Sequence, residues 1–212
     1  GSVFAQQAKY VFYFIGDGMG LNQVNGTEMY LAEQEGRIGT TSLCFASFPV
    51  VSFATSFSGT NSVTDSAAAG TALATGQKTK NGAIGVSKDD EPIYSIATLA
   101  KNAGKKVGIA TSVSIDHATP ASFYAHQPNR SMYYEIANDL PKANFDFYAG
   151  AGFLQPVEAE SNKESIYPLF NKSGYTVAKG FDDFLSRYQQ SDKIILMQKD
   201  DSYPYSIKYA ID

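Results

Sequence analysis

A short apolar run that ends at a cluster of glycines constrains this 212-residue chain more than any other feature. Residues 10–15 read YVFYFI, and residues 16–20 read GDGMG. A continuous run of β-branched and aromatic residues is typical of a parallel strand that is buried on both faces. The glycines permit a tight turn, and Leu21, Val24 and Leu31 then recur at helical spacing. The pattern predicts a strand, a turn and a helix.

The alternation of strand and helix continues along the chain. Alanine, the best helix former, dominates residues 67–74, which predicts a helix that has Ser66 at its N-terminus and stops at Gly76. We expect an α/β fold with a mostly parallel central sheet flanked by helices on both faces. The further predicted helices are 93–103, 121–126 and 131–140, and the further predicted strands are 106–112, 145–149 and 194–197. The remaining segments are expected to be mainly loops and turns. They are residues 41–57, with short strand segments; 77–86, with extended structure; 116–120; and 167–188, with helical signals.

Composition excludes several classes of protein. The net charge of -4 is spread along the chain without a basic stripe, so nucleic-acid binding is not expected. The single cysteine, Cys44, excludes an internal disulfide and a cysteine-based zinc site, and its apolar neighbours predict a small buried side chain. No stretch approaches the ~20 apolar residues of a membrane span.

Domain organisation is expected to be simple. We interpret Gly1 and Ser2 as the remnant of a removed tag, and residues 3–9 as an N-terminal extension, in which residues 3–7 could be the end of a signal peptide or the start of a mature, exported chain. Residues 10–212 contain no repeat and no convincing linker, which predicts one domain.

Two polar sites at predicted strand or helix ends could carry chemistry. Ser66 follows Asp65 at a helix N-terminus, where the local field favours anions and could help a serine hydroxyl to act as a nucleophile. Helix capping alone would also explain this pair. Asp17 sits among glycines after the first apolar run, as expected for a metal ligand and equally for a turn aspartate.

The chain has only two histidines, His117 and His126, and each could be structural. A serine hydrolase would need one of them within hydrogen-bond reach of Ser66, and the chain lacks the Gly-x-Ser-x-Gly elbow. Arg130 could be a surface residue, although its planar fork suits a tetrahedral oxyanion.

Taken together and in order, these segments closely resemble the alkaline phosphatase family. The resemblance covers residues 10–155, the N-terminal portion of such a protein, and is carried by FIGDGMG at 14–20, VTDSAAA at 63–69, TGQKTKNGAIGV at 75–86, HATPA at 117–121 and YAHQPNR at 124–130. It implies that Ser66 attacks phosphorus as a metal-bound nucleophile and that Asp65 orients Arg130, which grips the phosphate. It also implies an alkaline-phosphatase-like fold that is incomplete at its C-terminus.

The resemblance further implies metal sites for two zinc ions and one magnesium ion, with zinc as the alternative to magnesium. Asp17 would bridge one zinc and the third site, where Thr119 and His117 would be ligands; because some family members carry aspartate at the position of His117, Asp116 could compensate. Two zinc sites need several imidazole and carboxylate ligands, and we find no such set after Thr119.

These implications predict metal-dependent hydrolysis of phosphate monoesters through a phosphoserine, with inorganic phosphate as product. We expect a secreted or periplasmic protein, with a homodimer as a candidate assembly. Residues 1–212 are expected to be a truncation that is inactive alone. The alternative is a non-catalytic domain that binds phosphate or metal at Ser66 and Arg130.

Overall fold

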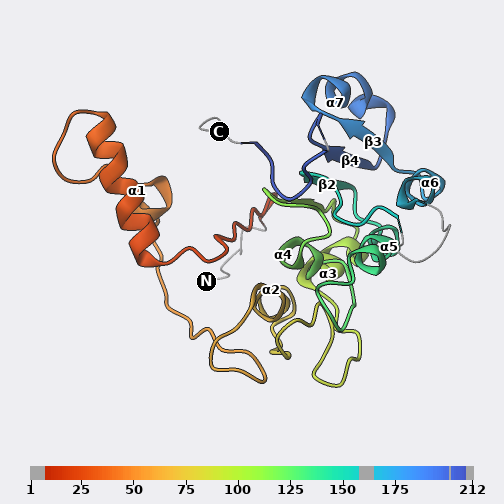
Figure 1. The fold of residues 1–212 in the computed structure, drawn as a ribbon, viewed down its shortest axis with the longest axis horizontal. Coiled ribbons are helices and arrows are strands. Elements are labelled where there is room, and N and C mark those ends of the chain that lie inside the picture. The colour runs from red at the N-terminus through yellow and green to blue at the C-terminus, as the bar shows by residue number, and fades with distance from the viewer. Residues whose placement is uncertain (1–7, 158–164, 201, 209–212) are drawn as a thin grey trace, which may run out of the picture. The chain divides into compact units, whose positions relative to one another are not determined.

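The structure is a computed structural model that describes residues 8–157, 165–200 and 202–208. The chain divides into two compact units, Gly1–Ala54 and Thr55–Asp212. Figure 1 shows the elements of both units, which are described separately below. The prediction of one domain over residues 10–212 stays a prediction.

The first unit contains the helix α1, Leu21–Gln34, and the 3-10 turn η1, Cys44–Ser47. The helix after the glycine turn is therefore confirmed. The predicted strand at residues 10–15 is wrong: no ladder among the described residues includes it, and Phe14 is 88% exposed. An apolar run becomes a strand only when a neighbour pairs with its backbone. Cys44 is exposed, so the expectation of a buried cysteine is also wrong.

The second unit is built on a four-stranded sheet in the order β1-β2-β4-β3, in which every neighbouring pair is parallel. The strands are β1 Gly108–Ala110, β2 Phe147–Gly150, β3 Thr176–Lys179 and β4 Ile194–Met197. The predicted α/β class with a parallel sheet is confirmed. We did not predict β3, because its four residues lie within a stretch that carries helical and turn signals.

Six α-helices lie in the described part of this unit. They are α2 Ser66–Thr75, α3 Ile96–Asn102, α4 Ala118–Ala121, α5 Tyr133–Ala143, α6 Ile166–Lys172 and α7 Phe181–Arg187, and the 3-10 turn η2, Tyr188–Gln190, follows α7. Helix α2 starts and stops where the sequence predicts.

Helix α4 corrects the prediction of a loop at 116–120 and a helix at 121–126. It begins after His117, whose backbone is extended, and Pro120 is tolerated because it lies in the first turn. The Tyr124 hydroxyl donates to the Ile115 carbonyl oxygen at 2.8 Å, which joins the segment after α4 to the loop before it.

The core lies where the sheet meets α5 and α6 and the segment around α4. Three buried tyrosines direct their hydroxyls to main-chain carbonyls: Tyr124 to Ile115, Tyr148 to Leu140 and Tyr175 to Phe145. These bonds satisfy polar atoms that would be costly to bury alone. The core thereby holds the loop after β1, helix α5 and the segment that leads into β2.

Candidate functional site

Ser66 is the first residue of α2, as the sequence predicts. The chain enters the helix through Asp65 in an extended conformation (φ -99°, ψ 174°), and the Asp65 carboxylate accepts a hydrogen bond from the Ala68 amide at 3.0 Å. The capping role that the sequence offered for Asp65 is therefore present. The Ser66 hydroxyl is consequently placed at the N-terminal end of α2, where the helix dipole favours negative charge.

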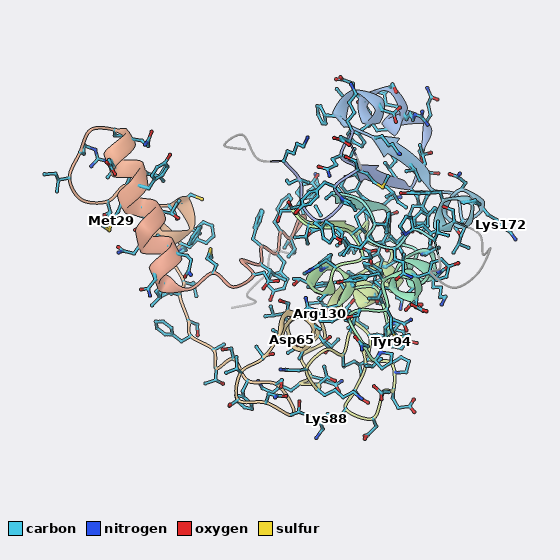
Figure 2. All side chains as sticks on the ribbon, in the orientation of Figure 1. Met29, Asp65, Lys88, Tyr94, Arg130 and Lys172 are labelled. Carbon is cyan, nitrogen blue, oxygen red and sulfur yellow. The ribbon has the colours of Figure 1, made fainter. Side chains whose placement is uncertain are left out.

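Asp65 also reaches beyond its own helix. Its Oδ2 atom accepts hydrogen bonds from the Gly82 amide and from Nη1 of Arg130, both at 3.1 Å. The Arg130 amide in turn donates to the Gly82 carbonyl oxygen at 2.7 Å. Figure 2 shows Asp65 and Arg130 together next to α2. Two residues 65 positions apart in the sequence thus form one ion pair immediately before Ser66.

The electrostatic balance keeps Asp65 ionised. Burial, the largest influence, would raise the pKa of this carboxyl, but hydrogen bonds from the Ala68 and Gly82 amides and from Arg130 outweigh it, and the pKa is lowered from its usual value. The Oδ1 atom of Asp65 caps the helix, and its Oδ2 atom accepts the hydrogen bonds from Gly82 and Arg130. It therefore acts as an anchor for Arg130 rather than as a free carboxylate.

Helix α4 brings the segment with His117 and Thr119 to α2. The two helices pack closely at Gly70, where an added Cβ would lie 2.7 Å from the Ser122 hydroxyl oxygen and 3.5 Å from Cα of Thr119. A side chain at Gly70 would force the helices apart. Three predicted site residues are thereby placed on two helices that pack against each other: Ser66 begins α2, Thr119 lies in α4, and His117 directly precedes α4.

Asp116 precedes this segment and is fully buried. Its Oδ2 atom accepts a hydrogen bond from the Leu154 amide at 2.8 Å, which joins the loop after β1 to the loop after β2. Burial raises the pKa of Asp116 to about 6, although hydrogen bonds from backbone amides, among them that of Leu154, work against the rise. The sequence suggested this residue only as a substitute ligand, whereas its described contact is an anchor between loops.

His126 is held by contacts with residues from other segments of the second unit. Its Nδ1 atom lies 2.6 Å from the Gly85 carbonyl oxygen, and its ring meets Tyr94 edge to face at 5.0 Å between centroids. The His126 amide donates to Asp139 at 3.0 Å. Of the two readings that the sequence left open for His126, these contacts match the structural one.

Asp17 lies in the first unit, in the glycine turn that the sequence predicts. The Met19 amide closes this turn by donating to the Gly16 carbonyl oxygen at 3.2 Å, and Asp17 is exposed. Its assignment as a metal ligand remains a prediction.

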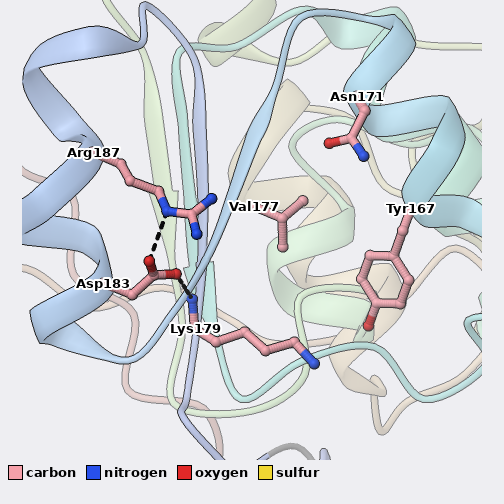
Figure 3. Close-up of a pocket in the computed structure, with 6 residues that line it drawn as sticks. All are labelled: Tyr167, Asn171, Val177, Lys179, Asp183 and Arg187. Atoms are coloured by element: carbon pink, nitrogen blue, oxygen red, sulfur yellow. Dashed lines mark hydrogen bonds and ion pairs between the residues drawn. The ribbon is translucent and has the colours of Figure 1, made fainter.

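A shallow concave surface lies elsewhere in the second unit, between α6 and the β3–α7 segment. Figure 3 shows its lining, in which the Asp183 carboxylate accepts hydrogen bonds from Arg187 and from the Lys179 amide. None of the predicted site residues lines it. The concavity therefore gives no separate reason to move the candidate site away from Ser66.

The metal prediction can be compared with the available donors. Within the described ranges, no group of three or more histidine, cysteine, aspartate or glutamate side chains could hold a metal ion. A catalytic zinc usually has about three protein ligands. The described residues therefore do not fit a complete zinc site by themselves.

Sequence reasoning missed the role of one turn. It read Asn81 and Gly82 as a turn within extended structure, yet Gly82 contacts both Asp65 and Arg130 through its main chain. An Asn-Gly pair predicts only a local turn, so no sequence signal identified its partners.

The comparison with protein families decides which family the chain represents. The sequence model of the family described as "Alkaline phosphatase" matches residues 8–149. The chain belongs to the alkaline phosphatase family. The resemblance read from the motifs is thereby confirmed.

Relatives in this family include alkaline phosphatase 4 of Bacillus subtilis (strain 168), which is 51% identical over 122 residues, covering 54% of this chain and 25% of that protein. The mouse tissue-nonspecific alkaline phosphatase is 35% identical over 145 residues, covering 63% of this chain and 27% of its own length. The chain therefore spans about a quarter of the length of these curated relatives.

Solved alkaline phosphatases share the fold. The enzyme from the Antarctic bacterium TAB5 matches with a TM-score of 0.73 and 28% identity, covering 87% of this chain and 51% of that one. A cold-active alkaline phosphatase from Shewanella sp. also gives a TM-score of 0.73, with 29% identity, over 93% of this chain and 47% of its own. Among the residues that the structure describes, no helix has the length and apolar character needed to span a membrane.

Proposed function

We propose that this chain carries the nucleophile and the phosphate-gripping arginine of a metal-dependent phosphate monoesterase. The observation that supports this most strongly is the ion pair of Asp65 and Arg130 directly before Ser66, at the start of α2. In a family of alkaline phosphatases, the combination of an alcohol, a helix N-terminus and an anchored guanidinium matches the needs of a phosphate ester.

In the proposed reaction, the Ser66 hydroxyl loses its proton to solvent as its oxygen attacks phosphorus. A bond from Oγ to phosphorus forms, and the bond from phosphorus to the ester oxygen breaks. The alcohol leaves with that oxygen, and its proton comes from solvent. Water then attacks the phosphoserine and gives up a proton to solvent, the bond from phosphorus to Oγ breaks, Oγ regains a proton from solvent, and inorganic phosphate is released. Arg130 would hold two non-bridging oxygens, and Asp65 would keep the guanidinium in place.

Metal ions belong to the proposal because of the family and not because of the described donor set. The resemblance implies two zinc ions and a magnesium or zinc ion, with Asp17, Ser66, Thr119 and His117 among the ligands. One solved relative is a variant of the TAB5 enzyme, with a histidine replaced by aspartate, that is described with Mg bound. The described residues do not by themselves form a complete metal site.

The setting of the enzyme is also proposed from its family. We propose a secreted or periplasmic protein that acts on phosphate monoesters and assembles as a homodimer. The alternative, a non-catalytic phosphate- or metal-binding domain, is not favoured, because the relatives are named alkaline phosphatases.

The test uses the protein expressed from its complete open reading frame and the substrate p-nitrophenyl phosphate. We expect zinc-dependent turnover that S66A lowers by about a thousandfold or more, and a phosphoryl group on the peptide that contains Ser66 after an acid quench. R130A should raise KM and weaken inhibition by inorganic phosphate. Turnover that survives S66A unchanged would refute the nucleophile assignment.

The 212 residues on their own provide the second comparison. We expect them to turn over p-nitrophenyl phosphate negligibly, since the carboxylate of Asp17 and the imidazole of His117 are too few ligands for two zinc sites. Robust zinc-dependent activity of residues 1–212 would contradict this expectation. Tight phosphate binding by the complete protein without any turnover would instead support the non-catalytic alternative.

A further inference from the structure

The side chain of Asn81 holds the segment that leads to Ser66. Its Nδ2 atom donates to the Val63 carbonyl oxygen at 3.1 Å, and its Oδ1 atom accepts from the Asp65 amide at 3.3 Å. The main-chain amide of Asn81 donates to the Thr60 hydroxyl at 3.3 Å. One carboxamide therefore spans the residues directly before the nucleophile and fixes them at two points.

The next residue continues the same connection to the other two members of the proposed site. The Gly82 amide donates to the Asp65 carboxylate, and the Gly82 carbonyl oxygen accepts from the Arg130 amide. The turn at residues 81 and 82 thus contacts the chain before Ser66, the anchor of the arginine and the arginine itself. A shift of this turn would move all three relative to one another.

We propose that Asn81 is a positioning residue for phosphoryl transfer, which sets the relative placement of Ser66, Asp65 and Arg130 without touching the substrate. This inference rests on the proposed function. The two bonds require a donor and an acceptor in one planar group, which asparagine has and aspartate, serine or alanine lacks. Asn81 is exposed, so its bonds compete with water and add little to global stability. Its chief effect is therefore geometric, and catalysis is sensitive to small displacements.

The experiment compares N81A and N81D with Asn102→Ala in the protein from the complete open reading frame. Asn102 is the exposed last residue of α3 and serves as the matched asparagine control. We expect N81A to lower kcat for p-nitrophenyl phosphate by about tenfold or more, with an unchanged melting temperature. N81D should be no better, because it keeps only the acceptor and adds a negative charge beside Asp65. The control Asn102→Ala should have the kcat and the melting temperature of the wild type.

A double-mutant cycle with Arg130 separates positioning from a general structural role. If Asn81 acts by placing Arg130 relative to Ser66, N81A should cost several-fold less in the R130A background than alone. Hydrogen exchange should also accelerate at residues 63–66 in N81A and stay unchanged in the sheet. Full additivity with R130A, or unchanged kcat in N81A, would overturn the inference.

The turnover of the wild-type protein distinguishes a failure of the role proposed for Asn81 from a failure of the proposed function. An active wild type whose N81A variant keeps its kcat refutes only the role of Asn81. A wild type without turnover, with S66A indistinguishable from it, refutes the proposed function and the catalytic role of Asn81 with it.

Discussion

The carboxylate of Asp146 offers a quantitative test of how the second unit is held together. It accepts hydrogen bonds from Nζ of Lys101 at 2.8 Å, from Nζ of Lys106 at 2.9 Å and from the Val107 amide at 2.9 Å. The side chain of Asp146 is 13% exposed, whereas that of Lys106 is 78% exposed. Asp146 therefore fastens the end of α3 and the start of β1 to the start of β2.

The cost of D146A can be worked out from these contacts. An unpaired, partly buried Val107 amide costs about 1–3 kcal/mol, and the half-buried pair with Lys101 adds up to about 1 kcal/mol. Lys106 is exposed and should matter little. The expected loss is about 2–3 kcal/mol, which for a domain of this size lowers the melting temperature by about 5–10 °C. D146N keeps an acceptor for Val107 and should lose about half as much.

The pH dependence of D146N follows from the pKa of Asp146. Burial, the largest influence, would raise this pKa, but Lys101, the Val107 amide and Lys106 lower it below the usual 3.8. A lowered folded-state pKa stabilises the protein above the unfolded value, and that contribution is lost as the pH falls through the folded value. The stability gap between wild type and D146N should thus be constant from about pH 8 to pH 5 and close below about pH 4.

The assay is urea unfolding followed by circular dichroism at several pH values. The control is D90N, which removes an exposed charge that pairs with Lys80 and leaves a residue that tolerates the positive φ at this position. D90N should leave the unfolding midpoint unchanged. A D146N protein as stable as wild type at pH 7, or a gap that persists unchanged in acid, would refute the account of Asp146.

Three further predictions concern packing. Gly85→Ala should destabilise the protein by more than about 3 kcal/mol in urea unfolding, because φ is +57° and the new Cβ would lie 2.0 Å from the Ala125 carbonyl oxygen; a milder loss would show that the loop yields. Tyr148→Phe should cost about 1 kcal/mol at equal activity, since its buried hydroxyl donates to a carbonyl of α5; an unchanged unfolding midpoint would show that this bond contributes nothing. Gly70→Ala should lower both kcat and stability by separating α2 from α4 at Ser122, and a normal kcat would contradict the link between this packing and the site.

Local features of the fold were predictable because their causes are local. An alanine-rich segment preceded by Asp65 and followed by Gly76 contains its own start and stop signals, and α2 has those bounds. The strand at Ile194–Met197 was predicted in full, because a short apolar run between polar segments suits the centre of a parallel sheet.

The errors arose where a partner elsewhere in the chain decides the outcome. Residues 10–15 have the composition of a buried strand, but a strand forms only against a neighbour, and none pairs with them in the described part of the chain. The strand Thr176–Lys179 was missed for the opposite reason, because β4 pairs with a segment whose own pattern is ambiguous. The helix expected at 121–126 lies instead at Ala118–Ala121, and the Tyr124 hydroxyl after it bonds to Ile115 before it.

By itself, the sequence determined the family, the parallel α/β class and the position of Ser66 at a helix start, since motifs and capping depend on residues close together in the chain. The family resemblance also implied that Asp65 orients Arg130, and the structure contains that ion pair. Only the tertiary structure decided that Asn81 binds the Asp65 amide, that Gly82 contacts both Asp65 and Arg130, and that α4 packs against α2 at Gly70. Those contacts join residues from 16 to 65 positions apart, and backbone hydrogen bonds and side-chain shape, rather than any local preference, select them.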